Sequence, residues 1–219
     1  METRIEGRFD FHMHSKYSFD GIMEPRDILR IASRSGLDQI SITDHDTIKG
    51  SVLARQSCME FGIKVIIGSE ISTDAGHIVG IDLNEDIKCK DWREVLDAIR
   101  AQGGLAILAH PYRGGAMTDE VASRCDVLEA FNCRSSPTQN ARATSLADAL
   151  GKPKIAASDA HVWSEVGRAR NRCDGVLTSC NVYAGEPARK TEKAFSSVIG
   201  DLRRRKLRNL PYHLSLLLR

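Results

Sequence analysis

The sequence predicts an α/β fold in which a parallel sheet closes into a barrel with helices outside. Two observations support this prediction. Short apolar segments alternate with segments of helical periodicity along most of the 219 residues, which is typical of a parallel sheet covered by helices. Polar side chains, above all histidines, gather at or just after the ends of the apolar segments. A closed barrel brings such strand ends together on one face, whereas an open sheet would separate the first from the last.

Length and composition allow one core. With 219 residues, of which 42% are hydrophobic, we expect a single domain over residues 1–219, with a C-terminal helix and a basic and apolar tail over about 186–219. The net charge of +2 does not by itself indicate a nucleic-acid partner. The run Arg203-Arg204-Arg205-Lys206 would contact nucleic acid or another acidic partner, or would form a solvated helix face. The sequence indicates no oligomeric state.

Cysteine usage and hydropathy predict the compartment. The six cysteines form no Cys-x-x-Cys pair, and no apolar segment typical of a signal peptide follows the N-terminus. No apolar run approaches the roughly 20 residues that a membrane span needs. We therefore expect a cytoplasmic protein with reduced thiols and no membrane association.

The elements follow from periodicity and end signals. Residues 8–14 alternate with period two, which places His12 and His14 on one face of a strand. Pro25 and Gly36 mark the start and end of a first helix. The further expected elements are strands over 37–43, 63–68, 77–83, 105–109, 127–131 and 154–157, and helices from Thr47 to about 62, from Asp91 to about 103, over about 138–150 and over about 195–202. We expect the last helix to pack on the outside of the barrel.

Nine histidine and carboxylate residues form one ordered series of candidate metal ligands. A lone histidine is usually a packed or hydrogen-bonded residue, but six histidines interleaved with carboxylates at strand ends indicate a metal cluster. His213 lies in the tail without an acidic neighbour and is not assigned. The candidate ligands are His12, His14, Asp20, His45, Glu70, His77, His110, Asp159 and His161.

The series resembles a known family. The segments His12-x-His14, Asp20, Thr43-Asp44-His45-Asp46, Gly68-Ser69-Glu70, His77, His110-Pro111 and Ser158-Asp159-Ala160-His161 are similar to the motifs of the PHP (polymerase and histidinol phosphatase) family. The resemblance implies a distorted (β/α)7 TIM-like barrel and a phosphoesterase with two or three Mn, Fe or Zn ions. It also implies an open site, because the interval between His77 and His110 is too short for the domain that some longer members insert there.

The resemblance implies how the ligands are shared. Three groups are implied: His12, His14, Glu70 and Asp159; Glu70 as a bridge with His77 and His110; and Asp20, His45 and His161. Asp44 would be the catalytic support that orients His45 from behind, a role for which Asp46 is a weaker candidate.

Phosphate recognition needs cations beyond the metal ions. Arg113, Arg134 and Arg168 each follow a predicted strand end, where a guanidinium can pair with phosphate. We therefore expect hydrolysis of a phosphate ester, in a phosphorylated small molecule, a nucleotide or an oligonucleotide, by hydroxide formed at the metal ions. Two alternatives remain open: an amidohydrolase-like metal hydrolase, whose barrels also begin with His-x-His, and a non-catalytic accessory module of nucleic-acid machinery.

Overall fold

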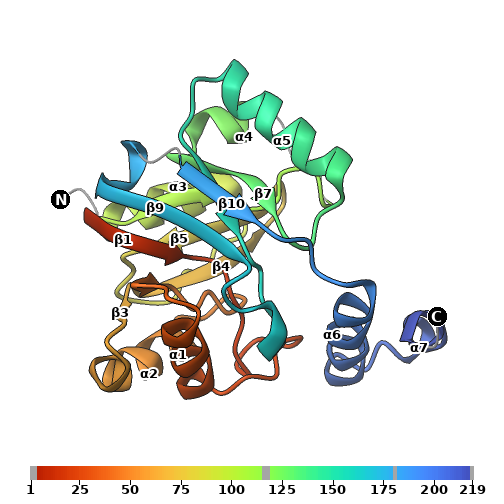
Figure 1. The fold of residues 1–219 in the computed structure, drawn as a ribbon. Coiled ribbons are helices and arrows are strands. Elements are labelled where there is room, and N and C mark those ends of the chain that lie inside the picture. The colour runs from red at the N-terminus through yellow and green to blue at the C-terminus, as the bar shows by residue number, and fades with distance from the viewer. Residues whose placement is uncertain (1–3, 115–118, 180–181, 218–219) are drawn as a thin grey trace.

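The computed structural model describes residues 4–114, 119–179 and 182–217 as a mixed α/β fold with two five-stranded sheets (Figure 1). The first sheet has the strand order β10-β9-β1-β2-β3 and the second β4-β5-β6-β7-β8. The strands are β1 (Arg4–Asp10), β2 (Gln39–Ile40), β3 (Lys64–Val65), β4 (Gly68–Thr73), β5 (Gly76–Ile81), β6 (Leu105–Leu108), β7 (Val127–Asn132), β8 (Lys154–Ala157), β9 (Ala169–Val176) and β10 (Val182–Gly185).

Seven α-helices lie within the described residues. They are α1 (Pro25–Arg34), α2 (Lys49–Ser57), α3 (Trp92–Ala101), α4 (Asp119–Arg124), α5 (Pro137–Ala149), α6 (Lys190–Arg203) and α7 (Leu210–Leu217). Two begin as the sequence predicts. Pro25 opens α1, and the Asp91 carboxylate caps α3 by accepting hydrogen bonds from the amides of Arg93 and Glu94.

The strand pairing differs from the expected parallel barrel. Strands β1, β2 and β3 pair in parallel, as do β6, β7 and β8, but β5, β9 and β10 are antiparallel to their neighbours. A short turn joins β4 to β5, and a connection this short can only produce an antiparallel pair. A closed seven-stranded barrel is not seen in the described residues.

Short contacts nevertheless join the two sheets where the predicted strands end. The segment after β1 runs beside the segment after β8, with the Asp159 amide donating to the His12 carbonyl at 2.8 Å and the His14 amide to the Ala160 carbonyl at 2.7 Å. An isolated parallel bridge pairs His45 with Glu70 on the other side. The first and last of the predicted strands are therefore neighbours at the end of the fold that carries the histidines.

The core lies between the sheets and under the helices. One buried cluster draws Phe9 from the first sheet and Val79, Ile107 and Ile155 from the second, so it fills the space that the two sheets enclose. Helix α3 buries Val95, Leu96 and Ile99 in another cluster. Burial of such aliphatic side chains contributes about 1.5–3 kcal/mol each relative to exposure.

Strands β9 and β10 and helix α4 were not predicted. In β9 the buried positions Ala169, Asn171 and Cys173 alternate with exposed charged residues. This is the burial pattern of a half-buried strand, but its inner residues are too small or too polar to give an apolar signal. Reduced thiols hold for four cysteines, Cys58, Cys89, Cys125 and Cys133, whereas the expectation is wrong for Cys173, which is disulfide-bonded. Cys180 lies outside the described residues.

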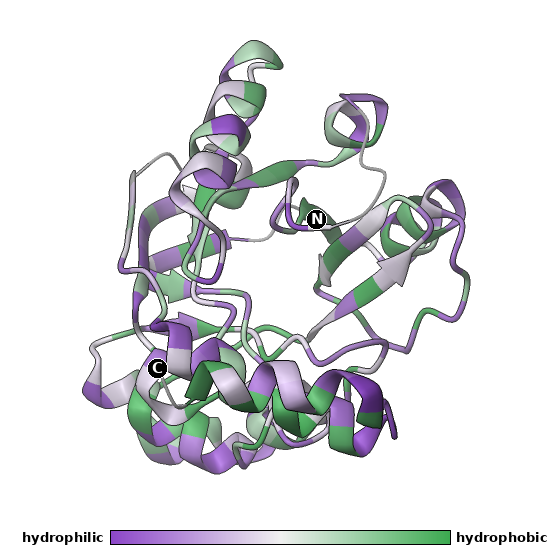
Figure 2. Cartoon of the chain, turned by 90° about the vertical axis from the view of Figure 1, so that its right-hand side faces the viewer, coloured by the Kyte–Doolittle hydropathy of each residue, from purple (hydrophilic) through white to green (hydrophobic). Residues whose placement is uncertain are grey.

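The C-terminal helices α6 and α7 stand beside the sheets rather than among them, and Figure 2 shows them in the foreground. Polar contacts dock α6: Arg203 donates to the carbonyls of Ser18 and Gly21 at 2.9 and 2.6 Å, and Glu192 pairs with Arg168 at 2.7 Å. Across the described residues, every helix is either too short or too polar to cross a membrane.

Candidate metal centre

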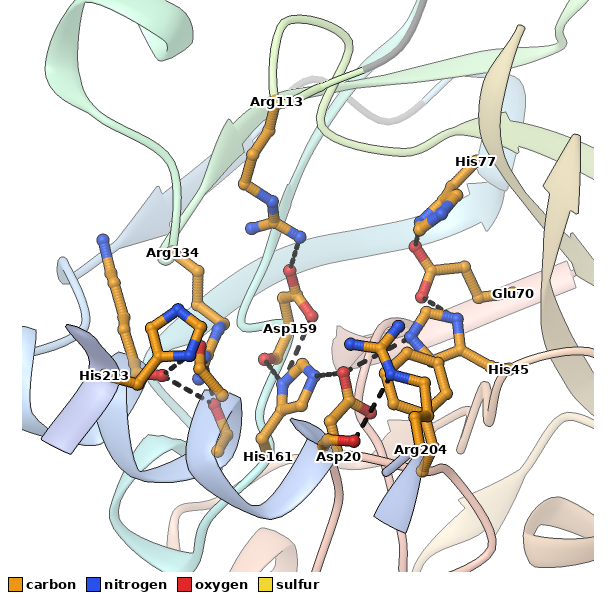
Figure 3. A pocket seen from close by; sticks show the side chains of 15 residues that line it. Asp20, His45, Glu70, His77, Arg113, Arg134, Asp159, His161, Arg204 and His213 are labelled. Atoms are coloured by element: carbon orange, nitrogen blue, oxygen red, sulfur yellow. Dashed lines mark hydrogen bonds and ion pairs between the residues drawn. The ribbon is translucent and has the colours of Figure 1, made fainter. Parts of the chain in front are cut away.

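The structure brings all nine candidate ligands to one end of the fold, around the buried carboxylate of Glu70 on β4. Glu70 Oε1 lies 2.7 Å from His77 Nδ1 and 2.9 Å from His110 Nε2. Glu70 Oε2 lies 3.3 Å from His12 Nε2, and 3.2 Å from both His14 Nε2 and His45 Nδ1. One carboxylate thus faces two different sets of imidazoles, and Figure 3 shows one member of each set, His77 and His45, beside Glu70.

Two more carboxylates complete the group. Asp159 Oδ1 lies 3.2 Å from His14 Nε2 and 3.6 Å from His12 Nε2. Asp20 Oδ2 lies 3.1 Å from His161 Nε2 and 3.5 Å from His45 Nε2. The ligand atoms of His14, Asp20, His45 and His161 all lie within 4.8 Å of one another.

A buried acid that sequence reasoning missed supports two of these histidines. Glu129 on β7 accepts a hydrogen bond from His12 Nδ1 at 2.6 Å through Oε1 and from the His110 amide at 2.8 Å through Oε2. The first contact leaves His12 Nε2 to face Glu70. A sequence signal existed, because Glu129 is a carboxylate inside the apolar strand Val127–Phe131.

A serine plays the same part for His14. His14 Nδ1 lies 2.9 Å from Ser18 Oγ, and the same oxygen accepts a hydrogen bond from the His45 amide at 2.9 Å. The loop that carries Asp20 therefore also fixes the ring of one candidate ligand and the backbone of another.

Two of the candidate ligands have a strained backbone conformation. His110 has φ 27° and Asp159 has φ 52°, and both residues carry a β-carbon in the left-handed region. Such conformations cost about 1–3 kcal/mol each and persist when the surroundings hold them in place. Here the site holds them, since the His110 amide donates to Glu129 and the Asp159 amide to the His12 carbonyl.

Protonated histidines balance the negative charge of the clustered carboxylates. Burial opposes ionisation of Glu70, but the charges of His77, His12 and His45 outweigh it and hold the pKa of Glu70 well below its usual value. Burial also acts to lower the pKa of His14, yet contacts with Asp159 and Glu70 prevail and raise that pKa to about 10. The site is built to hold positive charge between its carboxylates.

The arrangement fits divalent metal ions. Three buried atoms of the group, Asp20 Oδ1, His45 Nδ1 and Asp159 Oδ1, make no hydrogen bond of good geometry within the described residues, although the last two lie 3.2 Å from Glu70 and His14, respectively. Buried polar atoms rarely lack a partner, and a bound cation would supply one. Imidazole nitrogens mixed with carboxylate oxygens are the donor set that Zn, Fe and Mn accept.

A cavity of about 360 Å³ opens over the cluster. Arg113 and Arg134, two of the three arginines predicted to bind phosphate, line it (Figure 3). Arg113 donates to Asn132 Oδ1 at 2.9 Å and pairs with Asp159. Arg134 pairs with the buried Glu165 at 2.6 Å. Both guanidiniums therefore reach the cavity from fixed positions.

Arg168 and Asp44 have other contacts. Arg168 is not among the described residues that line the cavity, and its guanidinium donates two hydrogen bonds to Glu192, at 2.8 and 2.7 Å. The Asp44 carboxylate accepts hydrogen bonds from the amide and hydroxyl of Ser15, both at 2.6 Å, rather than from the His45 ring that we expected it to orient. Asp44 thereby fixes the backbone next to His14.

Helices α6 and α7 stand outside the sheets, and their residues also line the other side of the cavity. The sequence analysis did not assign their residues to the site. Arg204 lies over the Phe19 ring with its guanidinium carbon 4.0 Å from the ring centroid, and Phe19 stacks on His45 at 4.5 Å. The lining residues from this side are Lys193, Ser196, Ser197, Gly200, Arg204 and His213.

Comparison with known proteins places the chain in a family. A family model described as PHP domain matches residues 10–135, which is more than half of the chain, and a model described as PHP-associated matches residues 137–179. An uncharacterised protein of Methanocaldococcus jannaschii is 46% identical over 137 residues, which cover 56% of this chain and 80% of that protein.

Two characterised relatives are much longer than their match. A 5'-3' exoribonuclease of Haemophilus influenzae is 37% identical over 36% of this chain and 30% of its own length. An error-prone DNA polymerase of Nocardia farcinica is 41% identical over 29% of this chain and 6% of its own length. The matches therefore span less than a third of either protein.

Solved structures share the fold at low identity. A two-domain protein of Bacteroides vulgatus, described as containing a predicted PHP-like metal-dependent phosphoesterase, superposes with a TM-score of 0.69 at 20% identity over 90% of this chain and 74% of that one. An amidohydrolase of Chromobacterium violaceum, solved with sulfate and without metal, superposes with a TM-score of 0.62 at 16% identity over 82% of this chain and 92% of that one. Because the PHP domain model matches more than half of the chain, the chain belongs to the PHP family.

Proposed function

We propose that this protein is a metal-dependent phosphoesterase that hydrolyses a phosphate ester. The observation that carries the proposal is the geometry of Glu70, whose two oxygens face separate groups of imidazoles. A carboxylate placed in this way could serve as a ligand to two cations, one through each oxygen. Asp20, His45 and Asp159 each have a buried atom without a hydrogen bond of good geometry, which supports their assignment as further metal ligands around Glu70.

The ligands fall into three groups in this proposal. Bound Mn, Fe or Zn ions would neutralise phosphate oxygens and lower the pKa of water toward neutrality. The protein's part is to hold the ligands in place, and the bound ions would replace the protons that the histidines carry without metal. The first group is His12, His14, Glu70 and Asp159; the second is Glu70, His77 and His110; the third is Asp20, His45 and His161.

Arg113 and Arg134 bind the phosphate in this proposal. Both line the cavity above the ligands. A guanidinium offers paired donors that match phosphate oxygens. Arg168 is not included, because it is not among the described residues that line the cavity. Asp44 supports catalysis indirectly, by fixing Ser15 next to the ligand His14.

The nature of the relatives favours a nucleotide or oligonucleotide substrate over other phosphorylated small molecules. Two proteins that resemble parts of this chain are named as enzymes that act on nucleic acid, a DNA polymerase and an exoribonuclease. Arg203 donates to the Ser18 carbonyl and Arg204 lies over the Phe19 ring, so both already have partners in the loop around Phe19. Contact between the basic run and a nucleic acid would therefore depend on the exposed Arg205 and Lys206.

A metal and activity screen tests the proposal. Protein reconstituted with Mn, Fe or Zn should hold two or three ions per chain by elemental analysis, and should release phosphate or nucleotide from at least one phosphomonoester, nucleotide or oligonucleotide. Glu70→Gln is the matched inactive control, and Glu94→Gln, on an exposed face of α3, is the neutral one. A metal-loaded protein without turnover on any ester would favour the accessory-module alternative, and amide hydrolysis would favour the amidohydrolase alternative.

A further inference from the structure

The cavity contains one histidine outside the metal cluster, His213 on α7, and its orientation is fixed. His213 Nδ1 lies 2.7 Å from Asp201 Oδ2 of α6, and Asp201 is only 2% exposed. A carboxylate that accepts a hydrogen bond from Nδ1 holds the ring in one orientation and leaves Nε2 for another partner. His213 lines the same cavity as Glu70, Asp159 and the arginines (Figure 3).

The other histidines are not free for proton transfer. The six cluster histidines face the carboxylates Glu70, Asp159 and Asp20 through at least one nitrogen each. The arginine guanidiniums that line the cavity stay protonated at any physiological pH and are poor proton donors. Hydrolysis of an alkyl phosphate nevertheless produces an alkoxide, which needs a proton as it departs.

The position of His213 depends on a docked helix. Arg203 holds the C-terminal end of α6 on the carbonyls of Ser18 and Gly21, in the loop that carries Asp20. Gly200 allows this close approach, since a β-carbon there would lie 3.2 Å from Asp20 Cβ. Asp201 follows Gly200 directly, so the residue that orients His213 is tied to the rim of the metal cluster.

We propose that His213, oriented by Asp201, donates the proton to the leaving group of the ester. This inference rests on the proposed phosphoesterase activity. The oxygen of a water molecule bonds to phosphorus, the bond between phosphorus and the ester oxygen breaks, and the proton on His213 Nε2 passes to that departing oxygen. The proton that the water gives up restores the protonated ring. Asp201 is a positioning residue, and it does not exchange a proton.

Lys193 is the competing donor. It lines the cavity, and burial together with the nearby charges of Arg134 and Arg113 lowers the pKa of its ammonium. Lys193 has no oriented carboxylate partner among the described contacts, whereas His213 has Asp201 at 2.7 Å. The experiment therefore includes both residues.

The test compares two esters that differ in how much their leaving group needs a proton. Mn-loaded wild type, His213→Gln, Asp201→Asn and Lys193→Met are assayed on 4-nitrophenyl phosphate, whose leaving group departs as an anion, and on glycerol 2-phosphate, whose leaving group is an alkoxide. We expect kcat of His213→Gln to fall roughly 10²- to 10⁴-fold on the alkyl ester and less than about tenfold on the aryl ester. Asp201→Asn should show the same selective loss in smaller measure. Tyr212→Phe, at the exposed neighbouring position, is the control.

Each outcome decides the assignment. Equal losses of His213→Gln on both esters, with metal content unchanged, would show a structural role and overturn the inference while the phosphoesterase proposal stands. A selective loss in Lys193→Met but not in His213→Gln would transfer the role to Lys193 and likewise overturn it. A metal-replete wild type that hydrolyses neither these two esters nor any nucleotide or oligonucleotide would refute the proposed function, and the inference with it.

Discussion

His12 Nδ1 lies 2.6 Å from Glu129 Oε1, and both residues are 1% exposed. The contact joins the segment after β1 to the middle of β7, two parts of the chain that are 117 residues apart. Burial opposes ionisation of Glu129, but the charge of His12 and their hydrogen bond outweigh it and lower the pKa of Glu129. The carboxylate therefore stays an acceptor and determines which imidazole nitrogen faces Glu70.

Glu129→Gln should weaken metal binding without touching a ligand. The carboxylate accepts from three donors, His12 Nδ1, the His110 amide and Asn132 Nδ2. The amide nitrogen of a glutamine would oppose at least one of them. We expect a loss of about 10- to 100-fold in metal affinity, measured by competition with a chelator. Glu120→Gln, at an exposed position, is the control, and an unchanged affinity in Glu129→Gln would refute the supporting role.

Glu70→Gln should cost the protein more than one metal ion, because Glu70 is proposed to belong to two groups of ligands. His77→Ala removes a residue from one group only and should cost one ion at most. Elemental analysis of both variants after reconstitution with Mn gives the comparison. The bridging assignment would be wrong if Glu70→Gln retained as many ions as His77→Ala.

The ligand series and much of the helical structure could be predicted from the sequence. His12, His14 and Asp159 were predicted to meet because polar residues followed successive apolar segments, and the structure places them together. Helix α3 was predicted from its cap and its apolar stripe, both of which are local signals. Local signals of this kind depend on a few adjacent residues, and they survive whatever the tertiary arrangement is.

The antiparallel strand pairs and the second side of the site were not predicted. Strand direction depends on which segments pair, and the antiparallel β9 presents only Ala169, Asn171 and Cys173 to the interior, which is a weak signal. The place of α6 over the cavity depends on long-range polar contacts such as that of Arg203 with the Ser18 carbonyl, 185 residues away. The apolar periodicity of α6 predicts a helix, but it does not predict that Arg203 contacts Ser18.

Gly50→Ala should destabilise the protein although it lies in a helix. Alanine usually stabilises a helix by roughly 0.5–1 kcal/mol relative to glycine. At this position a β-carbon would lie 2.0 Å from Asp44 Oδ2 and 2.6 Å from Ser15 Oγ, the groups that fix the backbone beside His14. We expect a lower midpoint of chemical denaturation and weaker metal retention. Arg55→Ala, exposed in the same helix, is the control, and an equal or higher midpoint in Gly50→Ala would contradict this account.

Arg113→Met should impair substrate binding while leaving the metal ions in place. The substitution keeps most of the length of the side chain but removes the guanidinium that faces the cavity. Loss of one charge-assisted contact to phosphate costs about 1.5–3 kcal/mol, or roughly ten- to a hundredfold in kcat/KM. Unchanged kcat/KM at full metal occupancy would remove Arg113 from the phosphate site, and Arg93→Met on the exposed face of α3 controls for general loss of charge.

Arg168→Ala should loosen α6 rather than remove a substrate contact. Arg168 donates two hydrogen bonds to Glu192 in the first turn of α6, and Glu192 also accepts from Ser164 Oγ at 2.6 Å. Loss of the guanidinium should lower the free energy that docks this end of the helix by about 1.5–3 kcal/mol. The amides of α6 should then exchange with solvent faster than those of α3. The control is Arg172→Ala in the following strand β9, where the arginine side chain is 70% exposed. This variant should leave the exchange of the α6 amides unchanged. If Arg168→Ala instead raised KM with normal exchange in α6, Arg168 would bind substrate, as the sequence alone suggested.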